Sequence, residues 1–201
     1  TFVKNFSKKN MEKERVILGI DPGTNVLGYS IIEQRGKQSQ LLKMDVLVLG
    51  TKDDLSTKMK KLFDQITEII DIFKPDILAI EAPFFGKNVQ SMLKLGRAQG
   101  ICIAAAFSRS IPFVEYSPRK VKQSITGNGA ASKEQVANML QRMFKFEAIP
   151  SYLDATDALA VAVCHSYQKE DLLVSNSSVK KTSSKKSSWA SFVSQNPDRV
   201  K

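Results

Sequence analysis

Residues 17–29 read ILGIDPGTNVLGY, and this stretch decides the fold class. It continues an apolar run that starts at Val16 and ends in an acid, Asp21, before the turn sequence PGTN. A short apolar run bounded by turn residues is typical of a buried strand. Two segments with strand composition follow at 28–33 and 41–49, joined by a polar turn. The pattern therefore predicts three consecutive strands that form an antiparallel meander.

Helices and strands alternate after this meander. Apolar residues recur at helical spacing over Leu55–Phe73, and Ile77–Glu81 (ILAIE) is a second short apolar run that ends in an acid. The rest of the pattern predicts a helix at Asn88–Arg109, a strand at Pro112–Tyr116, and helices that begin at Ser117, Ser132 and Asp154. This order predicts an α/β fold, with a mixed five-stranded sheet flanked by helices.

The formal net charge of +10 is unevenly distributed. Residues 84–145 hold ten Lys and Arg against two acids, whereas the segments on either side of this block are acidic. A basic block beside acidic ones suits an enzyme that has a carboxylate centre and a phosphate-rich substrate. An ordinary solvated surface explains the charge equally well.

Both ends of the chain differ from its middle in composition. We expect an N-terminal extension at 1–15, a globular body at 16–168, and a Ser/Lys-rich tail at 169–201. Because the tail has little apolar surface to bury, we expect basic, disordered ends. Cys102 and Cys164 match no metal-site spacing, which fits a reducing cytoplasm. No run approaches the ~18 apolar residues of a membrane span, and no signal peptide is recognisable.

Four carboxylates lie at strand ends or near the start of a helix, where they could form a site. Asp21 and Glu81 end two similar strands, LGID and LAIE, and parallel neighbours would bring both side chains to one edge of the sheet. Asp154 and Asp157 lie three residues apart on one helix face. Taken singly, each acid is more typical of a turn or a cap. Four mutually repelling carboxylates together indicate a divalent-cation site, for which Mg²⁺ is the default.

The chain resembles the RuvC-type crossover-junction endodeoxyribonucleases, which have the RNase H-like fold of the retroviral-integrase superfamily. The resemblance runs from about Val16 to Tyr167. It is carried in order by ILGIDPGTNVLGY (17–29), AIEAPFFGKN (79–88), LKLGRAQG (93–100), VEYSPRKVKQSITGNGAASKEQV (114–136) and DATDALAVA (154–162). The motif DPGT alone also occurs in sugar-kinase and Hsp70-like ATPases, but that fold needs two such domains.

The resemblance implies roles for individual residues. The family's metal-binding catalytic acids correspond here to Asp21, Glu81, Asp154 and Asp157. They would hold Mg²⁺, two ions per site, with Mn²⁺ as a substitute, to clamp the scissile phosphate.

Other matched positions concern DNA. Phe84 falls where the family places an aromatic that stacks on unpaired bases. Lys122 and Lys133 match basic residues near the scissile phosphate. Arg119 and Lys87 are candidate backbone contacts, for which a solvated surface is an equal alternative.

The implied function is resolution of four-way (Holliday) junctions in DNA recombination and repair, by paired symmetric nicks. The resemblance also implies a cytoplasmic homodimer that pairs through its second helix and works with the RuvA–RuvB branch-migration complex. The apolar stretch Ile101–Phe107 agrees with such pairing, although burial within the monomer explains it too. Two alternatives remain, a junction-binding protein without cleavage and an RNA-processing nuclease. We interpret His165 as a structural residue.

Overall fold

A computed structural model describes residues 14–50, 52–83 and 88–168. The predicted N-terminal extension and C-terminal tail lie outside these ranges, apart from Glu14 and Arg15, and so do Phe84 and Lys87. The strands are β1 (Glu14–Asp21), β2 (Val26–Arg35), β3 (Gln38–Val48), β4 (Ile77–Glu81) and β5 (Phe113–Tyr116). The helices are α1 (Leu55–Phe73), α2 (Val89–Phe107), α3 (Pro118–Thr126), α4 (Lys133–Phe144) and α5 (Leu153–Ser166).

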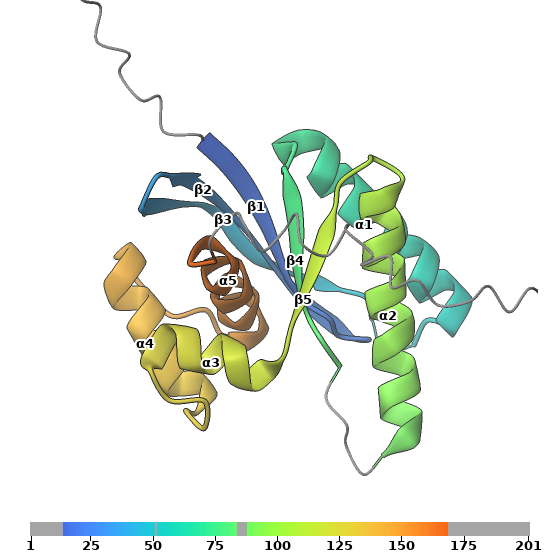
Figure 1. Ribbon diagram of the computed structural model, residues 1–201. Helices are drawn as coiled ribbons and strands as arrows, with labels where there is room; N and C mark the ends of the chain where they lie inside the picture. The colour runs from blue at the N-terminus through green and yellow to red at the C-terminus, as the bar shows by residue number, and fades with distance from the viewer. Residues whose placement is uncertain (1–13, 51, 84–87, 169–201) are drawn as a thin grey trace, which may run out of the picture. The chain divides into compact units, whose positions relative to one another are not determined.

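The five strands form one mixed sheet, as predicted, and their order is β3-β2-β1-β4-β5 (Figure 1). The first three strands are an antiparallel meander, in which β1 pairs with β2 and β2 with β3. β4 lies parallel to β1, with Ile20 opposite Ile80, and β5 lies parallel to β4. Because Asp21 and Glu81 each follow that pair by one residue, both leave the sheet at the same edge.

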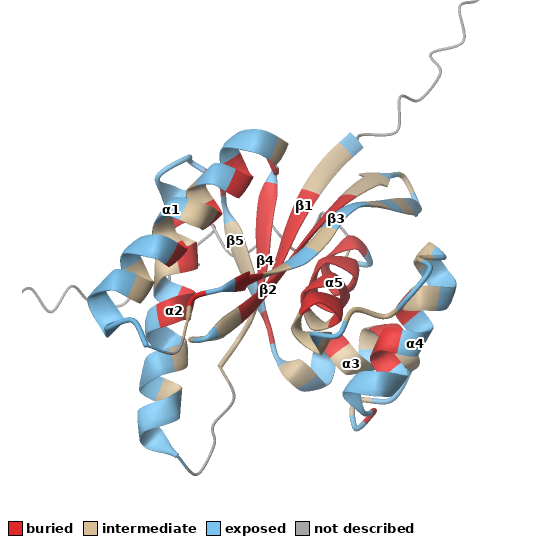
Figure 2. Cartoon of the chain, turned by 180° about the vertical axis from the view of Figure 1, so that it is seen from behind, coloured by how far each residue is buried: buried red, intermediate tan, exposed pale blue. Residues whose placement is uncertain are grey.

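The helices cover both faces of the sheet. α1 and α2 pack together on one face, and α5 crosses β1 and β2 on the other (Figure 1). Large side chains of β1, β4 and α1, among them Leu18, Leu78 and Leu62, are fully buried in the core. α5 is buried nearly all round because α3 and α4 cover the side that does not face the sheet (Figure 2).

Helix ends follow the local sequence closely. Ser117 and Ser132 are N-caps as predicted, and Ser132 forms a capping box with Gln135. The possibility that Asp154 is merely an N-cap is wrong, because α5 begins one residue earlier and its N-cap position is Tyr152. β1 begins two residues before the expected Val16, because its backbone pairing with β2 continues to Glu14 opposite Arg35, whose side chains also form an ion pair.

Among the helices that the structure describes, none combines the length and the apolar composition of a membrane span.

Candidate active site

The edge of the sheet where β1 and β4 end holds a small cavity. It has a volume of about 150 Å³ and is lined by Asp21, Pro22, Glu81, Ala82, Pro83 and Leu95. Two of the four predicted acids therefore share one cavity, although 60 positions separate them in the chain. The parallel pairing of β1 and β4 is the cause, because it aligns the ends of the two strands.

α5 brings the other two acids to this edge through an unusually close approach to the sheet. A methyl group built on Gly28 would lie 1.9 Å from the backbone oxygen of Asp154, and one on Gly19 would lie 2.4 Å from that of Ala158. The Ser30 hydroxyl donates a hydrogen bond of 3.0 Å to the same Ala158 oxygen. Small residues on β1 and β2 thus let the first turns of α5, which carry Asp154 and Asp157, lie against the sheet.

The carboxylates interact electrostatically. Burial, and then the negative charges of Glu81 and Asp157, raise the pKa of Asp21 well above its ordinary value. Burial, and then the charge of Asp157, raise the pKa of Glu81 to about 7. Burial likewise raises the pKa of Asp157. Charge on these groups is disfavoured where they stand, and a bound cation would relieve that cost.

Two lysines oppose this negative charge. Lys133 is the first residue of α4, and its ammonium group donates to Oδ2 of Asp157. Its positive charge also lowers the pKa values of Asp21 and Glu81. The positive charge of Lys122, on α3, likewise lowers the pKa values of Glu81 and Asp157. The predicted basic residues Lys122 and Lys133 therefore lie beside the acids.

The donor set fits a hard divalent cation, because it consists of carboxylate oxygens at a buried, negatively charged edge. In the described part of the chain, however, no three His, Cys, Asp or Glu side chains converge closely enough to hold one ion as they stand. Lys133 occupies one oxygen of Asp157. Binding of an ion would thus require side-chain movements within an acid cluster that the backbone already assembles.

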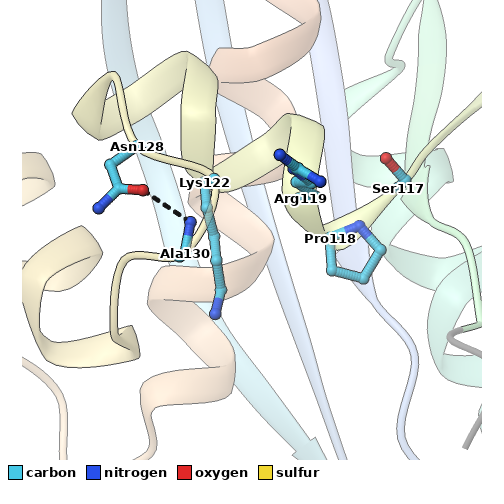
Figure 3. A pocket seen from close by; sticks show the side chains of 7 residues that line it. Ser117, Pro118, Arg119, Lys122, Asn128 and Ala130 are labelled. Carbon is cyan, nitrogen blue, oxygen red and sulfur yellow. Dashed lines mark hydrogen bonds between the residues drawn. The ribbon is translucent and has the colours of Figure 1, made fainter.

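A basic pocket of about 600 Å³ lies along α3 and the loop that follows it (Figure 3). It is lined by Ser117, Pro118, Arg119, Lys122, Asn128, Gly129 and Ala130. Asn128 orders the loop on one side of the pocket, because its side-chain oxygen accepts a 2.9 Å hydrogen bond from the backbone N–H of Ala130. A methyl group on Gly129 would come within 2.6 Å of Cγ of Arg119, so the loop lies directly against that side chain. Arg119 and Lys122, both on α3, line this pocket, whose volume has room for a phosphate group.

The remaining candidates have different outcomes. Phe84 and Lys87 lie outside the described residues. His165 is fully buried, and its Nδ1 lies 2.7 Å from the Tyr116 hydroxyl, which agrees with a structural role. Sequence reasoning missed Gln99, which lies within LKLGRAQG and contacts the backbone of Glu81. Its signal was an amide on the otherwise apolar buried face of a helix.

Comparison with known proteins places the chain in a family. The family profile for "Crossover junction endodeoxyribonuclease RuvC" matches residues 17–165. A protein of that name from Cytophaga hutchinsonii is 53% identical over 195 residues, covering 96% of this chain and 92% of the relative. One from Christiangramia forsetii is 48% identical over 198 residues, covering 98% and 99% respectively.

Solved structures agree. Thermus thermophilus RuvC, in complex with Holliday junction substrate, superimposes with a TM-score of 0.72 at 30% identity, over 76% of this chain and 93% of that one. The yeast mitochondrial Holliday junction resolvase Ydc2 has a TM-score of 0.55 at 13% identity, which shows a shared fold. The fold is RNase H-like, as predicted. Because the sequence matches extend over the sheet and over the helix that carries Asp154 and Asp157, the chain belongs to the RuvC family of crossover junction endodeoxyribonucleases.

Proposed function

We propose that this protein is a Mg²⁺-dependent endonuclease that resolves four-way DNA junctions in recombination and repair. The observation that carries the proposal is the group of acids at one sheet edge, where burial and mutual repulsion raise the pKa values of Asp21, Glu81 and Asp157. A protein that only binds junctions gains nothing from such a group, because carboxylates repel phosphates.

Asp21, Glu81, Asp154 and Asp157 would hold the metal, with two Mg²⁺ ions per site and Mn²⁺ as a substitute. Bound divalent ions supply positive charge that makes water more acidic and stabilises the leaving oxygen of a phosphodiester. Lys133 and Lys122, whose charges act on the same acids, would neutralise charge on the scissile phosphate. A cation held by Asp157 would free the Lys133 ammonium, which otherwise donates to that carboxylate, for this role.

The DNA backbone would enter the basic pocket. Arg119 and Lys122 line it, and neither side chain has a hydrogen-bonding or ion-pair partner within the described ranges. A guanidinium and an ammonium group that line the same pocket suit a phosphate. Lys87 would add a further backbone contact, and Phe84 would stack on an unpaired base next to the junction.

The protein would act as a homodimer through α2. The outward side of this helix carries a continuous stripe of apolar and small residues, which consists of Val89, Leu93, Gly96, Gly100, Ala104 and Phe107. Val89, Leu93 and Phe107 are 63%, 52% and 59% exposed. A methyl group on Gly96 or Gly100 would meet no heavy atom within 4 Å. A second copy would cover this stripe and place two active sites on like strands of one junction. The cytoplasm and the RuvA–RuvB complex are the location and partner that go with this function.

Cleavage of matched substrates tests the proposal. A synthetic four-way junction, a duplex of the same sequence and a structured RNA are incubated with Mg²⁺ at equal salt concentration. We expect nicking of the junction alone, which Asp21→Asn abolishes. Asp64→Asn is the matched control, because Asp64 is an exposed acid on α1 that pairs with Lys60. Junction binding with no cleavage, or cleavage by Asp21→Asn at the wild-type rate, would contradict the proposal. Preferential cleavage of RNA would favour the RNA-processing alternative.

A further inference from the structure

Gln99 joins two strand ends next to the acid cluster. It lies on α2, and the residue is 8% exposed. Its side-chain nitrogen Nε2 donates a 2.7 Å hydrogen bond to Oε1 of Glu115, near the end of β5. The same nitrogen lies 3.4 Å from the backbone oxygen of Glu81, the last residue of β4. One amide group therefore contacts both strands at the edge where the proposed metal site lies.

Glu81 lies at the end of its strand, so its contact with Gln99 bears on how its backbone is held. Glu81 forms the last register pair of β4 and β5, opposite Tyr116, and one more backbone hydrogen bond follows, from Ala82 to Tyr116. On the other side, the register between β1 and β4 ends one residue earlier, at the pair of Ile20 and Ile80. Glu81 therefore stands at the limit of the sheet, where the strand ladder constrains the backbone least.

Because Gln99 is polar, we infer that it does more than pack α2 against the core. Its buried neighbours on α2 are apolar, namely Ala98, Cys102, Ala105 and Ala106, and they secure the helix to the core. An apolar side chain would serve that purpose without the cost of burying an amide. Leu95, one turn earlier on α2, lines the cavity that contains Asp21 and Glu81. This face of α2 thus abuts the acids directly.

We propose that Gln99 is a positioning residue for Glu81. The short bond to Glu115 orients the amide, and the longer, weaker contact with the Glu81 oxygen restrains the backbone from which the carboxylate extends. Glu81 is thereby held toward Asp21 rather than free to turn away. The inference rests on the proposed nuclease function, although its effect on ion binding is measurable without DNA.

The test compares Gln99→Met with a matched amide. Methionine keeps the length and packing of glutamine but donates no hydrogen bond. The control is Gln141→Met, because Gln141 on α4 is likewise a helix glutamine whose side-chain nitrogen contacts two oxygens, here the backbone oxygens of Phe146 and Glu147, at 3.3 and 3.2 Å. Glu115→Gln keeps the acceptor oxygen, and Glu115→Ala removes it.

Two readouts separate positioning from stability. Mn²⁺ affinity without DNA, from the electron paramagnetic resonance signal of the free ion, should fall roughly 3- to 10-fold in Gln99→Met. Single-turnover junction cleavage should fall about 10- to 100-fold, as expected when a reacting group is displaced. Excess Mn²⁺ should restore part of that rate. Junction binding in EDTA should stay within about twofold of wild type.

The other variants complete the test. Gln141→Met and Glu115→Gln should match wild type in Mn²⁺ affinity and in cleavage rate. Glu115→Ala should lower both the affinity and the rate, as Gln99→Met does. The inference fails if Gln99→Met binds Mn²⁺ and cleaves like wild type. It fails equally if Gln99→Met melts at a lower temperature with Mn²⁺ affinity unchanged. If Gln99→Met does not fold, Glu115→Ala decides by the same two readouts. A wild-type protein that binds Mn²⁺ but cuts no junction would overturn the proposed function and leave the ion-binding comparison valid.

Discussion

At the scale of single residues, environment separates chemically similar groups into different roles. Asp21 and Asp71 are both aspartates, but burial among acids raises the pKa of Asp21, whereas a hydrogen bond from Arg109 lowers that of Asp71 on the surface. Lys133 and Lys60 each pair with an aspartate, yet only the partner of Lys133 is largely buried, with 12% of its side chain exposed. The proposed chemistry depends on these buried groups.

Removal of the Lys133 ammonium should reduce cleavage. In Lys133→Met, the Asp157 carboxylate loses its donor and the proposed phosphate contact disappears, so we expect a rate loss of about 10²-fold or more. Lys133→Arg should retain part of the rate, and Lys60→Met, which breaks an exposed pair on α1, should retain all of it. Single-turnover kinetics with saturating enzyme measure this effect. Wild-type rates in Lys133→Met would remove Lys133 from the site.

His165 should make the fold sensitive to mild acid. Burial, and then the charges of Arg15 and Lys120, lower its pKa to about 4. Because the unfolded value is about 6.5, the unfolded chain binds a proton first as pH falls, and stability that is present above about pH 6.5 is lost toward pH 4. At pH 5 this loss amounts to about 2 kcal/mol.

Urea unfolding of wild type and His165→Gln at pH 7.5 and pH 5 isolates this effect. The raised pKa values of Asp21 and Glu81 act in the opposite direction, but they do so in both proteins. The stability advantage of wild type should therefore shrink by about 2 kcal/mol at the lower pH. An advantage that does not change with pH would mean that His165 is not held neutral in the fold.

At the scale of elements, the site depends on how closely α5 lies on the sheet. The residues beneath its first turns are Gly19, Gly28 and Ser30, and the last of these donates directly to the backbone of α5. The acids on α5 lie near Asp21 only because the backbone of α5 approaches the backbones of β1 and β2 so closely that no Cβ atom would fit between them.

Gly28→Ala should therefore affect stability and cleavage together. The added methyl group would overlap the backbone oxygen of Asp154, and backbone atoms cannot rotate away as a side chain can. We expect a loss of about 1–3 kcal/mol in the free energy of unfolding and a severe loss of cleavage, since α5 must move away from Asp21. Urea unfolding and junction cleavage measure both effects. Full activity in this variant would show that the acids of α5 need no close approach.

Sequence alone could predict most of this arrangement, for physical reasons that differ between residues. Asp21 and Glu81 follow from strand composition and the geometry of parallel pairing. Asp154 and Asp157 follow from helical spacing. The contact of Gln99 with Glu81 could not be predicted from the sequence. Helical periodicity shows which side of α2 is buried, but it does not show which strand end lies opposite each residue. The close approach of α5 to Gly28 could not be predicted either, because α5 lies far from Gly28 in the sequence.

At the scale of the whole molecule, the two faces of the sheet have separate tasks. α5, with α3 and α4 around it, brings acids and bases together on one face, whereas α1 and α2 close the core on the other. α2 belongs to both tasks, since its inner side reaches the acids through Leu95 and Gln99 and its outer side carries the exposed stripe.

Gly100→Arg should separate the subunits without harm to the fold. No heavy atom lies within 4 Å of a methyl group at Gly100, so the fold has room for a side chain there, and arginine favours a helix over glycine by up to about 1 kcal/mol. We expect a monomer with an unchanged or higher melting temperature. The control is Gln90→Arg, which adds the same charge on α2 beside the stripe. Light scattering coupled to gel filtration gives the masses. A dimer that survives Gly100→Arg would place the interface elsewhere.

The central claim, that four acids form a metal-dependent nuclease site used in symmetric pairs, is tested most directly on a supercoiled plasmid that extrudes a cruciform. Paired nicks across the junction convert the circle to linear DNA in one binding event, whereas single nicks leave an open circle. With Mg²⁺, wild type should yield mainly linear product, Gly100→Arg mainly open circles, and Asp21→Asn neither. Open circles as the main product of wild type, or linear product from Asp21→Asn, would contradict the account.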